Sequence, residues 1–197
     1  EGFNSPDELV DGVTYVKAAE VIRMLRLIIG EDNFREGKNL YFRKYSGGNA
    51  GTDRFFACFE EASGVNLTQF KKEWLYTIGY PRVEVTWSYN KRARKLDIKF
   101  TQSRAGAGGA FHLPVEMAVV DDMGKDVPGT ERVVEIISRE HDLAINNVPR
   151  AAFVSFSRDC SFYGTFSDKS VTPDQLAAQV RMDPNKFNRV EAMRMLT

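Results

Sequence analysis

The chain has 197 residues, of which 43% are hydrophobic and 27% are charged, a composition that is typical of a globular protein and excludes a disordered or low-complexity chain. Because 27 basic residues balance 27 acidic ones, and because no run approaches the roughly 20 apolar residues of a membrane span, we expect neither a nucleic-acid nor a membrane partner. Two cysteines are too few for a disulfide framework or a zinc cluster, so we expect a reducing, cytoplasmic environment.

Apolar residues recur with helical spacing through residues 1–79, and glycines and capping residues divide this stretch into four predicted helices. The connections are short, which makes neighbouring helices antiparallel and predicts a compact helical array. The expected helices run from Thr14 to Gly30, from Asp32 or Asn33 to Gly47, from Thr52 or Asp53 to Gly64, and from Thr68 to Gly79.

At Tyr80 and Pro81 the period of the apolar residues changes from that of a helix to that of a strand. Two alternating segments flank the polar turn 90–95 and predict a β-hairpin. The glycine-rich segment 105–110 is predicted to be a flexible loop. In all, about seven short strands are expected, a pattern that is typical of a β-sandwich: 83–89, 96–100, 113–120, 133–137, 142–145, 152–157 and 162–166.

The helical pattern returns at Thr172, where residues 172–175 form a capping box with proline at the first helical position. A further helix is expected to begin at Asp183 and Pro184. The predicted fold class is therefore α+β and multidomain: a helical array, a β-sandwich and a second helical part. Because the sequence begins at Glu1 rather than Met and ends at Thr197 inside a predicted helix, we expect it to be a piece of a longer protein.

Residues that could carry chemistry are few. Metal-binding His-Glu-x-x-His, Cys-x-x-Cys, P-loop and Gly-x-Ser-x-Gly motifs are absent. His112 precedes a predicted strand and His141 is placed in a polar turn, so both are interpreted as solvated or locally bonded. Cys58 is expected to be buried and inert beside helical phenylalanines, and Cys160 to lie in a turn.

The charged and aromatic clusters have structural interpretations. Glu60 and Glu61 are neighbours on a predicted helix and point about 100° apart, so they do not form an acid/base pair. The basic run 91–95 lies in a hairpin turn and is interpreted as solvated. The aromatic residues at helical spacing indicate a core: Phe55, Phe56, Phe59, Phe70 and Trp74.

Tyr15 lies in the first turn of the first predicted helix, where backbone N–H groups are unpaired and the helix dipole is positive. A phenol there is a neutral hydrogen-bond donor that can stabilise a developing oxyanion. Composition and position alone still favour a structural tyrosine.

The segment 14–25, Thr-Tyr-Val-Lys-Ala-Ala-Glu-Val-Ile-Arg-Met-Leu, resembles a helix of the gluzincin-type zinc aminopeptidases, the family of aminopeptidase N (alanyl aminopeptidase). The similarity spans most of the chain, and its first helix is the most specific part. It continues through residues 30–34, 40–42, 59–65, Trp74, 79–81 and 112–115.

This resemblance implies three domains: residues 1–79 as the helical end of a thermolysin-like catalytic domain, residues 80–166 as an Ig-like β-sandwich, and residues 167–197 as the start of a C-terminal α-solenoid. It implies that Tyr15 is the catalytic tyrosine, which donates to the oxyanion of the tetrahedral intermediate. It places the Zn²⁺ ligands upstream, outside this chain, so the chain alone is expected to be inactive. The implied partners are peptide substrates and the remaining domains of the same polypeptide.

Two other readings remain open. The parent protein could be a family relative that has lost its zinc and acts as a protein-interaction scaffold, and its upstream sequence would decide between the two. The sandwich could instead be an independent binding module similar to immunoglobulin-like adhesion domains, in which case it would fold alone and bind a ligand of its own.

Overall fold

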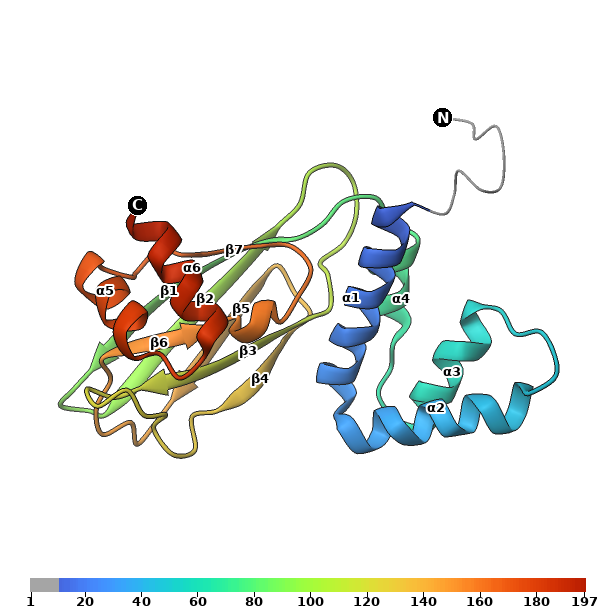
Figure 1. Cartoon of the computed structure of the whole chain (residues 1–197), viewed down its shortest axis with the longest axis horizontal. Coiled ribbons are helices and arrows are strands. Elements are labelled where there is room, and N and C mark those ends of the chain that lie inside the picture. The colour runs from blue at the N-terminus through green and yellow to red at the C-terminus, as the bar shows by residue number, and fades with distance from the viewer. Residues whose placement is uncertain (1–10) are drawn as a thin grey trace.

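A computed structural model describes residues 11–197, and residues 1–10 of the predicted first domain lie outside it. Figure 1 shows a group of helices beside a β-sandwich, with two C-terminal helices packed against the strands. This is the predicted α+β order. The helices are α1 (Gly12–Ile29), α2 (Glu31–Tyr45), α3 (Thr52–Ser63), α4 (Thr68–Leu75), α5 (Pro173–Met182) and α6 (Lys186–Leu196).

The helix α1 begins earlier than predicted. Its N-cap is Asp11, whose Oδ1 accepts a hydrogen bond of 2.6 Å from the backbone N–H of Thr14, so the prediction of Thr14 as the cap is wrong. Aspartate and threonine are both effective caps, and local sequence does not separate them. At the other end Gly30 has φ 80° and joins α1 directly to α2. The predicted start at Asp32 or Asn33 is therefore too late.

The helices α2 and α3 lie side by side (Figure 1). Phe34 stacks on Phe59 with a centroid distance of 5.2 Å. A Cβ on Gly37 would lie 2.5 Å from the Phe59 ring, so only glycine allows this approach. The short helix α4 ends at Leu75, before the predicted Gly79.

The sandwich consists of a four-stranded sheet in the order β5-β2-β1-β7 and a three-stranded sheet in the order β4-β3-β6. Alternate residues of β1 and β2 are buried between the sheets, while β3 is buried along almost its whole length. The seven strands confirm the predicted number: β1 (Arg82–Asn90), β2 (Lys95–Ser103), β3 (Leu113–Val120), β4 (Arg132–Ile136), β5 (Glu140–Ile145), β6 (Phe153–Phe156) and β7 (Thr165–Asp168).

The two C-terminal helices pack near β6 and a short 3-10 turn at Arg158–Cys160. The predicted capping box at Thr172 is present and begins α5. The next helix starts at Lys186 with Asn185 as its cap, rather than at Asp183 and Pro184. Asp183 is only 2% exposed, and its carboxylate accepts a hydrogen bond from the buried Ser155 hydroxyl. The helix begins instead where the Asn185 side chain accepts a hydrogen bond of 3.0 Å from the backbone N–H of Asn188.

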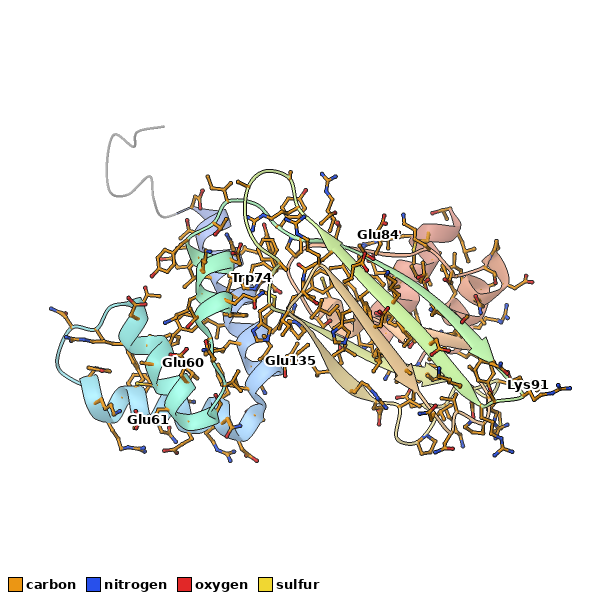
Figure 2. The ribbon with its side chains drawn as sticks, turned by 180° about the vertical axis from the view of Figure 1, so that it is seen from behind. Glu60, Glu61, Trp74, Glu84, Lys91 and Glu135 are labelled. Atoms are coloured by element: carbon orange, nitrogen blue, oxygen red, sulfur yellow. The ribbon has the colours of Figure 1, made fainter. Side chains whose placement is uncertain are left out.

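One hydrophobic core runs from the helical group into the sandwich. Trp74 of α4 is fully buried at the junction, and Figure 2 shows it between the two parts. Its indole Nε1 donates to the His112 carbonyl oxygen at 2.8 Å, and its ring lies 4.6 Å from that of Phe111. Within residues 11–197, none of the helices has the length and apolarity that crossing a membrane requires.

A bidentate ion pair ties the turn after β6 to the loop before β4. Arg158 Nη1 and Nη2 donate to the two carboxylate oxygens of Asp126 at 2.8 and 2.6 Å. The hydrogen bonds and charge of Arg158 lower the pKa of Asp126 below its ordinary 3.8. Because the pKa of Asp126 is lower in the folded state than in the unfolded state, the ionised carboxylate stabilises the fold fully at pH values above the unfolded-state pKa. This stabilisation is lost as the pH falls below 3.8 and through the folded-state pKa.

The Asp126→Asn variant is therefore expected to unfold with about 2 kcal/mol less free energy than the wild type at neutral pH, because Arg158 loses a charged acceptor. The difference should shrink as the pH is lowered through the acidic range, since the wild-type carboxylate becomes protonated as well. Urea unfolding at several pH values measures both. The Asp97→Asn variant, which breaks an exposed pair with Lys95, serves as a control that should lose less than about 1 kcal/mol. A difference for Asp126→Asn that does not depend on pH would contradict the ion-pair explanation.

Candidate active site

Tyr15 lies at the solvent-facing start of α1. Its backbone N–H donates to the Asp11 carbonyl oxygen at 3.2 Å, and its side chain is 68% exposed. The adjacent Val16 is also exposed, and the burial of α1 in the core begins only at Val21. The phenol therefore faces outward from the described residues rather than into the packed interior.

A phenol in this position can donate one hydrogen bond, and the described residues supply it with no metal centre. No group of three or more His, Cys, Asp or Glu side chains within residues 11–197 could hold a metal ion. The residues present therefore do not fit a zinc site. The chemistry that this chain can offer at Tyr15 is that of a single neutral donor beside the positive end of a helix.

The histidines are structural. His112 is almost fully buried, and its Nε2 lies 2.9 Å from Glu135 Oε2 while the Phe70 ring meets it edge-on. Figure 2 shows Glu135 on the sandwich side of the junction with the helices. His141 lies in strand β5, so its predicted place in a turn is wrong; the strand extends two residues further back than its apolar pattern indicated. Local bonding is thus the correct interpretation for His112.

Neither thiol is activated. Cys58 is buried, as predicted, and Cys160 is exposed in the turn after β6. Burial raises the pKa of both thiols above 9.0, which disfavours the nucleophilic thiolate. The Glu60 carboxylate accepts from the backbone N–H of Leu67 at 2.8 Å, whereas Glu61 pairs with Lys44. Glu60 and Glu61, both labelled in Figure 2, therefore have different partners and do not form an acid/base pair.

No local sequence pattern predicts the buried ion pair between Arg104 and Glu73, whose side chains are 5% and 3% exposed. Their Nη1 and Oε2 atoms lie 2.6 Å apart, and the guanidinium lies 4.4 Å over the Phe111 ring. The segment 105–110, predicted to be a flexible loop, wraps this pair: Gly109 N–H donates to Glu73 at 3.2 Å, and a Cβ on Gly108 would collide with Arg104. The glycines thus permit close packing around the pair.

Comparison with known proteins covers both parts of the chain. Residues 2–74 match the peptidase family M1 domain, and residues 79–169 match a domain of unknown function with an Ig-like fold. Aminopeptidase N of Escherichia coli is 29% identical over 92% of this chain. Together these matches support a fragment related to the M1 aminopeptidases. Aminopeptidase N of Caulobacter vibrioides is 39% identical over 46% of the chain.

The fold of this chain is also known from a solved structure. The structure of Legionella pneumophila aminopeptidase A in complex with aspartic acid covers 98% of the chain with a TM-score of 0.86 and 23% identity, and so shows the same fold. The chain spans 22% of the length of the Escherichia coli protein and 22% of the Legionella chain. Tyr15 lies within the part that matches the peptidase domain.

Proposed function

We propose that this chain is a segment of a full-length M1 aminopeptidase, which removes the N-terminal residue from peptides. The names of similar proteins from several organisms support this activity. The observation that carries the proposal for this chain is the outward-facing phenol of Tyr15 on a helix inside the peptidase match.

In the proposed reaction Tyr15 donates its phenolic proton in a hydrogen bond to the oxygen of the scissile carbonyl as that oxygen becomes negative. The phenol O–H acts in this step as a hydrogen-bond donor and not as a base. Its place in the first turn of α1 puts the phenol near the positive end of the helix dipole. Both effects favour the charged transition state over the neutral substrate.

The proposal assigns Zn²⁺ to residues outside this chain. When bound, the ion would polarise the scissile carbonyl and activate water. Residues 1–79 are proposed as the end of the catalytic domain, residues 80–166 as the sandwich domain, and residues 167–197 as the start of a C-terminal helical domain. The continuous core between the helices and the sandwich supports a role for the sandwich in holding the helical parts in place.

The test is hydrolysis of amino-acid anilides by the intact parent protein and by the 197-residue chain, each with and without a chelator. We expect the intact protein to hydrolyse the substrate in a chelator-sensitive way and the chain alone to show no activity, because one donor supplies neither a nucleophile nor a base. Chelator-sensitive hydrolysis by the chain alone would contradict the assignment of zinc to residues outside it. A folded but inactive parent would favour the scaffold alternative.

A further inference from the structure

The half of α1 that carries Tyr15 has little packing of its own. Residues 14–16 and 18–19 are exposed, and the first fully packed residue is Val21. The direction of this helix start therefore depends on contacts made near its middle. One polar contact lies at this boundary, at Arg23, two helical turns after Tyr15.

Arg23 joins α1 to the turn that follows β6. Its Nε lies 3.0 Å from Glu20 Oε2 on the same helix, which fixes the guanidinium. The same guanidinium donates to two backbone carbonyl oxygens of the turn, that of Asp159 at 3.5 Å and that of Cys160. These contacts connect residues more than 130 positions apart in the sequence.

The turn has an uncommon backbone. Ser157, Asp159 and Cys160 have φ values of 49°, 50° and 54°, a region that residues with a side chain rarely adopt. Such a conformation persists only where surrounding contacts hold it. Here the contacts come from Arg23 on one side and from the side chain of Arg158 on the other.

On its other side the turn is tied to the C-terminal helices. Arg158 donates through Nε to the Ser155 hydroxyl at 3.0 Å, in addition to its bidentate pair with Asp126. Ser155 in turn donates to Asp183 Oδ1 at 3.0 Å and accepts from Asn188 Nδ2 of α6 at 3.0 Å. A continuous series of hydrogen bonds therefore runs from α6 through the turn to α1.

We propose that the turn Ser157–Cys160 is a brace that fixes the direction of α1, and that Arg23 and Arg158 are positioning residues for Tyr15. This inference rests on the proposed function. Tyr15 lies about 12 Å from Arg23 along a rigid helix, so a small rotation at Arg23 displaces the phenol. A displacement of about 1 Å at a reacting group can cost on the order of 10² in rate.

The first test uses the intact parent enzyme. The Arg23→Met variant, which keeps an unbranched apolar side chain but removes the guanidinium donors, is expected to lower kcat about tenfold with KM within about twofold of wild type, because misplacing a donor affects the transition state more than substrate binding. If Arg23 acts through Tyr15, the same substitution in a Tyr15→Phe background causes little further loss. The Arg26→Met variant, which lies on the same helix and breaks an exposed pair with Glu31, is the control and keeps wild-type kcat.

An equal loss from Arg23→Met in both backgrounds would overturn the positioning role, as would wild-type kcat in the single variant. The second test does not depend on activity. In the 197-residue chain, Arg23→Met and Arg158→Lys are each expected to speed amide hydrogen exchange in the first half of α1 several-fold, while Arg26→Met leaves it unchanged. Unchanged exchange in both variants would overturn the brace. An inactive parent with the expected exchange changes would instead reject the proposed function and retain the brace.

Discussion

In the intact enzyme, replacing Tyr15 with phenylalanine is expected to lower kcat by about 10²–10³-fold, the usual loss when one oxyanion donor is removed. The substitution removes only the hydroxyl of a residue that is 68% exposed in this chain, so the fold should be retained. KM should change little, because the hydrogen bond strengthens only as the carbonyl oxygen becomes charged. Steady-state kinetics with an amino-acid anilide separate the two parameters.

Tyr76→Phe is the matched control, since the Tyr76 side chain is 66% exposed at the end of α4 and has no proposed role. It should retain wild-type kcat. Near-normal turnover in Tyr15→Phe would reject the assignment of Tyr15 as the donor. Equal losses in both variants would indicate a general effect of removing exposed hydroxyls.

The largest expected effect on stability is at the buried pair of Arg104 and Glu73. Arg104→Met removes the guanidinium that pairs with Glu73 and lies over Phe111, and it leaves the Glu73 side chain, 3% exposed, with the hydrogen bond from the Gly109 N–H. Breaking a buried pair from one side costs about 3–5 kcal/mol, because the remaining charge stays desolvated. Urea unfolding of the 197-residue chain at neutral pH measures the change.

A second substitution separates the lost pair from lost packing. Adding Glu73→Leu to Arg104→Met removes the stranded charge, so the double variant should recover part of the lost free energy of unfolding. Lys99→Met breaks the exposed pair with Glu140 and should leave the free energy of unfolding close to that of the wild type. The double variant could instead have a lower free energy of unfolding than Arg104→Met. That result would show that packing, and not charge, dominates the stability of this junction.

Where a pattern depends on neighbours in the sequence, the predicted elements agree closely with the structure. The strand at 113–120 matches β3, and the capping box at Thr172 begins α5, because strand alternation and capping are properties of a few adjacent residues. Gly64 ends α3 at φ 72° as expected of a residue without a Cβ. The number of strands followed from the same local signals.

The predictions were wrong where several local choices were equally good, and incomplete where a distant partner decided. Asp11 rather than Thr14 caps α1, although both residues are suitable caps. Asn185 rather than Asp183 caps α6, although both residue types are suitable caps. The segment 105–110 is a loop, as predicted, but its contacts with Arg104 and Glu73 are not revealed by any local feature of a glycine-rich stretch.

For the candidate site, the short-range pattern was enough to place Tyr15 in the first turn of a helix, because helix spacing and capping are encoded within one or two turns of the chain. Which way its phenol faces, and what holds the helix that carries it, were decided only by the fold. Those properties arise from contacts such as that between Arg23 and Cys160, which lie far apart in sequence and meet only once the sandwich has packed against α1.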